Sequence, residues 1–462
     1  MTVPQILNYK LSRYLRWKEK DNTVALFHEL HPEPVFVSKD KFHQIQNDFS
    51  NVDLTLANEL LSKGLLIESN NDDDQVFENS KVNLEQRLDR ASILYLVLIR
   101  GCNFTCSYCP IPSLEKQYGQ VTMSPITAVT AINYWARCIQ IDYDPDIPYF
   151  IIFYGGEPLL NKEALLVGLE HVSFLQNLGK LPKRNVNLMI STNGVLIDDD
   201  IISIFKKYQM MVVIGCDGPE EYHDQIRRSI EDRPTFRIVE QAIKRLVQSG
   251  VRTFASAAIT PHNIQAIKRF SIFYKQLGIE KFGFNFLRGK LLFSLIPQEK
   301  LSSYIEDATN GVLENFRNQN DPHYEAQMDR KYTAYCDKNF FPVDCNGYGN
   351  QLVIQPNGQI GNCPFLANDM GNIHTIGDSF RIKDVTIARE WRKRLPLYNS
   401  DCHDCEAKSI CGGGCAWNAQ EIKGDFYALD DAMCSLTKKA FDFFIWCDFE
   451  RMQNERKSFF TA

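Results

Sequence analysis

Three cysteines lie within one short loop, which reads Cys102-Asn103-Phe104-Thr105-Cys106-Ser107-Tyr108-Cys109. With three and two residues between them, these thiolates can wrap around one metal centre, and thiolates suit iron–sulfur clusters or zinc. A zinc site would want a fourth Cys or His nearby, and the adjacent residues offer none. Three ligands on a four-iron cluster leave one iron open for a substrate or cofactor. The loop therefore favours a catalytic iron–sulfur centre over the zinc alternative.

A second group of cysteines follows near the end of the chain. It reads Cys345-x12-Gly358-x4-Cys363, then Cys402-x2-Cys405-x5-Cys411-x3-Cys415, then Cys434. Taken alone, these spacings fit structural zinc about as well as iron, but the first loop shifts the balance to iron. Gly412-Gly413-Gly414 would let the chain curl tightly around a cluster. Cys138, Cys216 and Cys447 are interpreted as packing cysteines.

Composition limits the class of protein. The 462 residues include 14 cysteines, and the start of the chain carries no secretory signal. We therefore expect a cytoplasmic protein in a reducing compartment, where disulfides rarely persist and clustered cysteines bind metals. The net charge of −6 weighs against nucleic acid or an anionic membrane as the main partner. No apolar run is long enough to cross a bilayer.

The middle of the chain alternates short apolar strands with amphipathic helices, as in an α/β fold. The predicted strands are Ile93–Ile99, Tyr149–Tyr154, Asn187–Ser191, Met211–Cys216, Arg252–Ile259 and Lys281–Phe286. The predicted helices lie near Ile126–Cys138, Lys162–Leu178, Asp199–Lys207, Thr235–Ser249 and Ile264–Leu277. Such a series predicts a parallel sheet, open or closed into a partial (β/α)6 TIM-like barrel, with its chemistry at the carboxyl ends of the strands.

Two smaller regions flank this core, and we divide the chain into residues 1–87, 88–310 and 311–462. The first region contains strand-like stretches at Thr23–Phe27 and Pro34–Val37, a helix at Leu54–Lys63 and a loop at Asn70–Asp74, which together indicate a small winged-helix-like unit. In the last region, Pro356-Asn357-Gly358 predicts a hairpin turn between Gln351–Gln355 and Gln359–Cys363. Leu436–Arg456 predicts a closing helix.

The first cysteine loop, with an aromatic residue before its last cysteine, resembles the signature of the radical SAM enzymes. Three further segments follow successive strands and resemble the cofactor-binding segments of that family: Gly155-Gly156-Glu157-Pro158, Ser191-Thr192-Asn193-Gly194, and Asp217-Gly218-Pro219 with His223-Asp224-Gln225-Ile226-Arg227. The resemblance implies a [4Fe–4S] cluster on Cys102, Cys106 and Cys109, and cleavage of S-adenosylmethionine to a 5′-deoxyadenosyl radical. It also implies cofactor contacts from Tyr108, Gly155, Gly156, Glu157, Pro158, Ser191, Asn193, Asp217 and Arg227. Arg228 is the alternative to Arg227.

The later cysteines are similar to the SPASM extension found on a subset of radical SAM proteins. That resemblance implies two auxiliary [4Fe–4S] clusters. One would be held by Cys402, Cys405, Cys411 and Cys434, and the other by Cys345, Cys363 and Cys415, with Cys336 as the candidate fourth ligand.

Proteins with this extension mostly modify ribosomally made peptides or proteins. The leading hypothesis is therefore a peptide maturase that receives electrons from a flavodoxin or ferredoxin, with the N-terminal region as either a leader-peptide-binding unit or a plain accessory domain. Anaerobic sulfatase maturation is the second hypothesis. It expects an acidic residue after Cys363, where this chain has Pro364, and no catalytic base is assigned. An electron carrier or scaffold is the third, but it leaves the cofactor segments unexplained.

Overall fold

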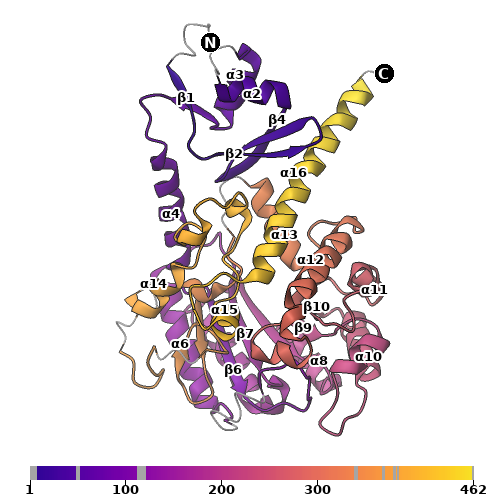
Figure 1. Ribbon diagram of the computed structural model, residues 1–462. Helices are drawn as coiled ribbons and strands as arrows, with labels where there is room; N and C mark the ends of the chain where they lie inside the picture. Colours follow the sequence, from indigo (N-terminus) through magenta and orange to yellow (C-terminus); the bar gives the residue numbers. More distant parts are fainter. Residues whose placement is uncertain are drawn as a thin grey trace.

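The computed structural model describes residues 8–47, 52–111, 121–337, 342–366, 370–377, 381 and 384–459. At its centre is an eight-stranded sheet in the order β11-β10-β9-β8-β7-β6-β12-β13 (Figure 1). Six of these strands pair in parallel and in chain order: β6 (Ile93–Ile99), β7 (Tyr149–Gly155), β8 (Val186–Thr192), β9 (Met211–Gly215), β10 (Arg252–Ile259) and β11 (Lys281–Phe286). The predicted α/β partial barrel is confirmed.

Helices follow the strands and cover the sheet. They are α6 (Pro125–Ile141), α7 (Lys162–Asn177), α8 (Asp199–Lys207), α9 (Glu220–Ile226), α10 (Phe236–Gln248) and α11 (Phe270–Gln276). Local sequence fixes several helix starts. Asp198 caps α8 by accepting a hydrogen bond from the Ile201 backbone N–H, and Ser124 caps α6 ahead of Pro125. The strands are apolar and largely buried because helices and other parts of the chain enclose both faces of the sheet.

The N-terminal part contains an antiparallel sheet of three strands, β2 (Leu15–Lys20), β3 (Thr23–His28) and β4 (His31–Ser38), here named the N-terminal sheet. Helices α2 (Lys39–Asn47) and α3 (Leu54–Ser62) follow it, β1 (Tyr9–Leu11) pairs with β5 (Leu66–Glu68), and α4 (Asp74–Leu88) leads into the core. The two predicted strands and the helix are confirmed. The elements β1, β2, β5, α2 and α4 were not predicted, because they are short or polar.

The C-terminal part contains α12 (Leu301–Arg317), α13 (Ala326–Cys336), β12 (Gln351–Ile354), β13 (Ile360–Gly361), α14 (Thr386–Arg392), α15 (Ala416–Lys423) and α16 (Asp431–Phe459). Both the hairpin and the closing helix are confirmed. β12 also pairs in parallel with β6, which extends the central sheet beyond its predicted edge. The predicted boundary at residue 310 falls inside α12, and the division into three domains stays a prediction.

The N-terminal sheet rests on α16, the long helix that rises from the core in Figure 1. Phe27 meets Phe441 with ring centroids 5.0 Å apart, and Phe36 contacts Trp446 and Phe449. These apolar contacts bring the first and last segments of the chain together. In the described part of the chain, no helix combines the length and apolar character needed to span a membrane.

Candidate active site

A cavity of about 290 Å³ opens at the carboxyl ends of the parallel strands. Its lining comprises Cys102, Phe104, Cys106, Tyr108, Cys109, Pro110, Ile111, Tyr154, Gly155, Gly156, Ser191, Thr192, Asn193, Gly215, Arg227, Ser256, Ala258, Asn285, Phe286, Leu287, Arg288, Phe365 and Trp417. The first cysteine loop and three of the predicted cofactor segments therefore meet in one place, as expected for the functional end of a parallel barrel.

The three loop cysteines lie close enough to affect one another electrostatically. Burial, and to a smaller extent the neighbouring thiolates, raise the pKa of Cys102 to about 11 and that of Cys106 to about 12; burial also raises the pKa of Cys109. Buried thiols of this kind are poor nucleophiles on their own, but a metal centre deprotonates the thiols that coordinate it. The donor set thus fits a thiolate-bound cluster.

The zinc alternative needs ligands gathered tightly around one ion, because Zn–S bonds are only about 2.3 Å long. Within the described ranges, no three His, Cys, Asp or Glu side chains are grouped closely enough to hold a single metal ion. The zinc alternative therefore has no ready-made site in this part of the chain.

Gly155 and Gly156 let the end of β7 lie directly against the cysteine loop. A Cβ on Gly155 would sit 2.3 Å from the Ile99 carbonyl oxygen, and one on Gly156 would sit 2.1 Å from the carbonyl oxygen of Gly101. Gly156 also donates a backbone hydrogen bond of 2.9 Å to Ile99. The sequence resemblance implies that these two glycines contact the cofactor. In the structure they line the cavity, but their close contacts are with the protein backbone.

The structure does not bring Glu157 into the cavity as a cofactor contact. Its side chain is fully buried behind the cavity wall, where it accepts hydrogen bonds from Leu159 N (3.0 Å), Thr192 Oγ1 (2.8 Å) and Asn193 N (2.7 Å). Burial raises its pKa to about 7, although these three donors favour the charged form. Glu157 thus fastens the second segment to the third, and Pro158, which is also buried, lies outside the lining.

Asp217 likewise stands behind the cavity and orients residues that line it. Its carboxylate accepts hydrogen bonds from Tyr108 Oη (2.9 Å), Arg227 Nε (2.8 Å) and Ala258 N (2.8 Å). The Arg227 guanidinium lies over Gly215, where a Cβ would come within 2.5 Å of Nη1. The structure therefore presents Tyr108 and Arg227 to the cavity and makes Asp217 their support.

The choice between the two adjacent arginines follows from their surroundings. Arg228 forms an ion pair with Asp232 and donates to the Asp224 carbonyl, away from the cavity. Arg227 alone of the two lines the cavity.

The third segment contributes both lining and support. Ser191, Thr192 and Asn193 face the cavity, and Asn193 Nδ2 donates a 2.6 Å hydrogen bond to Asn103 Oδ1 in the cysteine loop. This bond ties the end of β8 to the loop between Cys102 and Cys106.

Several lining residues were missed by the sequence interpretation. Tyr154, Phe365 and Trp417 form an aromatic wall, with ring centroids 6.3 Å apart between Tyr154 and Phe365 and 4.9 Å apart between Phe365 and Trp417. Arg288 adds a positive charge next to this wall. A usable signal existed for two of them, because Phe365 and Trp417 each stand two residues after a predicted cluster cysteine.

The C-terminal cysteines separate into two groups. In the first group, Cys345, Cys363 and Cys415 lie close together. Burial is the main cause that raises the pKa values of Cys345 and Cys363, and the neighbouring thiolates raise them further. The second group comprises Cys402, Cys405, Cys411 and Cys434, which also lie close together. Burial raises the pKa of Cys402 to about 11 and that of Cys434 to about 12, and neighbouring thiolates of the group contribute. Each group brings together cysteines predicted for one cluster, and the assignment of the clusters stays a prediction.

Cys336 is not brought into either group. It is exposed at the end of α13, where its thiol lies near Tyr332 and near Asp448 on α16. The structure thus leaves three cysteines in the first C-terminal group, and the role predicted for Cys336 receives no geometric support.

Gly412 serves the close packing of the C-terminal groups. A Cβ there would come within 2.2 Å of the Asp344 backbone nitrogen, next to Cys345. Asp344 in turn accepts a 3.0 Å hydrogen bond from Gly414 N. The glycine run therefore brings the segments of Cys345 and Cys415 together.

Comparison with known proteins identifies the domain that holds the first cysteine loop. Residues 96–270 match the model of the radical SAM superfamily. Residues 96–270, which carry the first cysteine loop and the cofactor segments, therefore form a radical SAM domain within this chain. The chain is therefore an enzyme that uses a [4Fe–4S] cluster and S-adenosylmethionine, as the sequence resemblance implied.

Individual relatives of this radical SAM enzyme cover most of its length. It is 23% identical to the radical SAM cyclopropyl synthase TigE of Paramaledivibacter caminithermalis, over 93% of this chain and 94% of that protein. It is also 23% identical to the cysteine-type anaerobic sulfatase-maturating enzyme of Clostridium perfringens, over 76% of this chain and 95% of that protein.

Solved structures share the fold. The structure of anSMEcpe with bound AdoMet and Cp18Cys peptide aligns with a TM-score of 0.62 at 20% identity, covering 79% of this chain and 99% of that one. Streptococcus suis SuiB bound to the precursor peptide SuiA aligns with a TM-score of 0.50 at 14% identity, covering 92% and 99%.

Proposed function

We propose that this enzyme modifies a ribosomally made peptide or protein at an unactivated C–H bond. The observation that carries the proposal is the shared cavity, in which the first cysteine loop faces an aromatic wall supplied partly by the C-terminal region. Relatives named for cyclopropyl synthesis and for subtilosin biosynthesis support a peptide substrate. An aromatic wall of this kind suits the apolar and peptide groups of such a substrate.

We assign the SAM-binding cluster to Cys102, Cys106 and Cys109. When bound, the cluster and S-adenosylmethionine supply the 5′-deoxyadenosyl radical that removes a hydrogen atom from the substrate. Arg227 offers a fixed positive charge to the cofactor carboxylate, because Asp217 holds it through Nε and leaves its terminal nitrogens facing the cavity. Tyr108, Ser191 and Asn193 complete this side of the site.

The opposite side of the cavity belongs to the substrate in this proposal. Phe365 and Trp417 exclude water, and Arg288 attracts a carbonyl or carboxylate group of the peptide. Cys345, Cys363 and Cys415 would hold one auxiliary [4Fe–4S] cluster, and Cys402, Cys405, Cys411 and Cys434 would hold the other. A flavodoxin or ferredoxin would provide electrons.

The N-terminal sheet supports a leader-peptide-binding role. Its two outer strands, β2 and β4, have no further strand beside them within the described residues, so either could accept a peptide as an added strand. Pro32 and Pro34 remove backbone donors from β4, whereas β2 has no proline. Strand addition is thus better supported on β2.

Formylglycine formation is the alternative reaction. Its support is the similarity to sulfatase-maturating enzymes over three quarters of the chain. Against it, the position after Cys363 is Pro364, which cannot act as a base. A cyclopropane or other crosslink on a peptide therefore remains the better-supported outcome.

The test is anaerobic co-expression of the enzyme with each short peptide encoded beside it. We expect a mass decrease in one peptide that depends on S-adenosylmethionine and on the intact cysteine loop. Unchanged peptides together with a mass change in a sulfatase would contradict the proposal and favour the alternative. Formation of 5′-deoxyadenosine by the enzyme alone serves as the control for cofactor loading.

A further inference from the structure

A buried ion pair joins the N-terminal sheet to the segment that carries the second group of C-terminal cysteines. Glu29 lies in the turn between β3 and β4, and its Oε1 is 2.7 Å from Lys408 Nζ. The side chains are only 1% and 2% exposed. Lys408 stands between Cys405 and Cys411, so the contact links two regions that are far apart in sequence.

The Lys408 ammonium also holds its own segment together. It donates a second hydrogen bond, of 2.8 Å, to the backbone carbonyl of His403, which lies between Cys402 and Cys405. The segment from Cys402 to Cys411, here named the cluster loop, also contains short-range backbone bonds, such as Cys405 N to Cys402 O and Cys411 N to Lys408 O. Lys408 therefore connects this loop both to itself and to Glu29.

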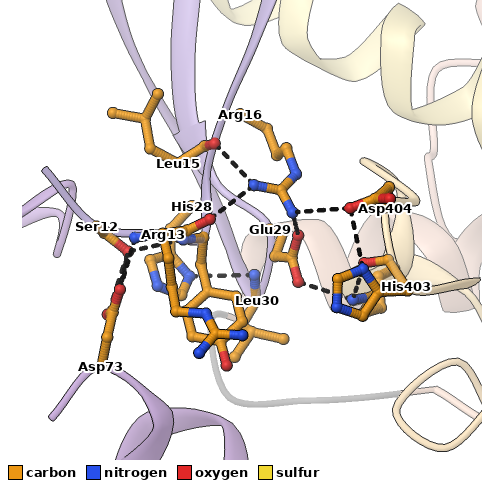
Figure 2. A network of polar contacts seen from close by, with 12 residues as sticks. Ser12, Arg13, Leu15, Arg16, His28, Glu29, Leu30, Asp73, His403 and Asp404 are labelled. Carbon is orange, nitrogen blue, oxygen red and sulfur yellow. Dashed lines mark hydrogen bonds and ion pairs between the residues drawn. The ribbon is translucent and has the colours of Figure 1, made fainter.

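Other charged residues of the N-terminal sheet reach the same loop. Arg16 forms an ion pair of 2.5 Å with Glu29 and lies 3.7 Å from Asp404, as Figure 2 shows. Lys18 Nζ is 2.5 Å from Glu406. All of these loop contacts fall between Cys402 and Cys411, whereas aromatic residues of the sheet pack on α16 and its other apolar residues pack on α2 and α3.

The energetics indicate what such a pair can do. A buried ion pair adds little net stability, because removing both charges from water offsets most of their attraction. Its best-attested role is to fix one register between packed elements, since any other register leaves a buried charge unpaired. Apolar contacts are non-directional, so those of the sheet hold it in place without selecting one pairing of charges.

We propose that the N-terminal sheet positions the second auxiliary cluster site through the Glu29–Lys408 pair. Glu29 and Lys408 are positioning residues in this proposal, because they act on Cys402, Cys405 and Cys411 through the cluster loop. The N-terminal region would thus be part of the machinery that holds the cluster, whether or not it also binds a peptide.

The test is hydrogen exchange of the full-length, anaerobically reconstituted enzyme, read in the amides of the cluster loop. We expect Glu29→Gln and Lys408→Met each to speed exchange in this loop about tenfold, because each removes a buried charge-assisted hydrogen bond. The double variant should exceed either single by far less than the product of the two effects, because the residues act as one pair. Lys393→Met is the matched control, since Lys393 forms an exposed ion pair with Glu390 and should leave the loop unchanged.

Iron content and the midpoint potentials of the reduced clusters give a second readout. We expect Lys408→Met to shift the potential of one cluster while the other two keep theirs. Loop exchange equal to wild type in both single variants, or effects that multiply in the double variant, would overturn the proposal. Should Lys408→Met fail to fold, wild-type exchange in the cluster loop of Glu29→Gln, which retains the side-chain volume, overturns the proposal by itself. The outcome does not depend on the peptide substrate.

Discussion

The two cysteine-bearing regions are built in opposite ways. In the core, most lining residues stand at or just after the end of a parallel strand, and the buried carboxylates of Glu157 and Asp217 join neighbouring strand ends by hydrogen bonds. In the C-terminal region, turns, close-packed glycines and a contact with the distant residue Glu29 gather the cysteines. The core site is thus preformed by one sheet, whereas the auxiliary sites need several separate segments to meet.

Cys102→Ala should give the largest change, because it removes one of only three ligands of the SAM-binding cluster. We expect 5′-deoxyadenosine formation to fall to background and the iron content to fall by about four of roughly twelve atoms. Iron analysis and chromatography of the nucleoside products measure both effects. Cys138→Ala, a free cysteine on α6, is the matched control and should retain activity. Full activity in Cys102→Ala would break the distinction between the two regions.

Cys415→Ala should show whether cofactor cleavage in the core depends on the C-terminal cysteines. We expect the variant to lose up to about four iron atoms and its peptide modification, while most cofactor cleavage without peptide persists because the core site is built independently. Electron paramagnetic resonance of the reduced protein distinguishes the clusters. Equal loss of cofactor cleavage in Cys102→Ala and Cys415→Ala would show that the two sites depend on each other.

Cys336→Ala provides a control for the C-terminal groups. Since Cys336 is exposed beside α16, we expect its iron content to equal that of the wild type. A loss of iron in this variant would instead support Cys336 as the fourth ligand of the first auxiliary cluster.

The smallest expected effect concerns the pH dependence of stability in the core. Burial raises the pKa of Glu157 from 4.5 to about 7, so the folded state binds more protons than the unfolded state between these values. The free energy of unfolding of the wild type should therefore fall as pH rises through this window, by at most about 1.4 kcal/mol per pH unit, and level off above it. Relative to Glu157→Gln, whose amide does not titrate, the advantage of the wild type should shrink over the same window in denaturant titrations. An advantage that grows with pH would show that the three donors keep Glu157 charged.

How far the sequence predicts this molecule depends on the range of the interaction. The six parallel strands were predictable because each is a buried apolar run, and Ile93–Ile99 and Arg252–Ile259 were predicted with their observed bounds. The pairing of β12 with β6 was not, because it joins residues more than 250 positions apart.

The same limit applies to the site. The cysteine groups could be anticipated from spacing and resemblance, but the supporting role of Glu157 depends on Thr192 and Asn193, which only the fold brings close. The packing of Gly155 and Gly156 against the Cys loop was missed for the same reason. Spacing along the chain indicates which residues bind metal, and three-dimensional contacts decide which carboxylates face the cavity.

The strand β12 has a consequence for any attempt to divide this protein. It borders β6, the strand that leads directly into Cys102, and so it covers an edge that the catalytic sheet would otherwise expose. A shortened chain lacking this strand would present unpaired backbone groups beside the first cysteine loop, a surface prone to self-association. The C-terminal region therefore protects the edge of the catalytic sheet as well as carrying the second group of cysteines.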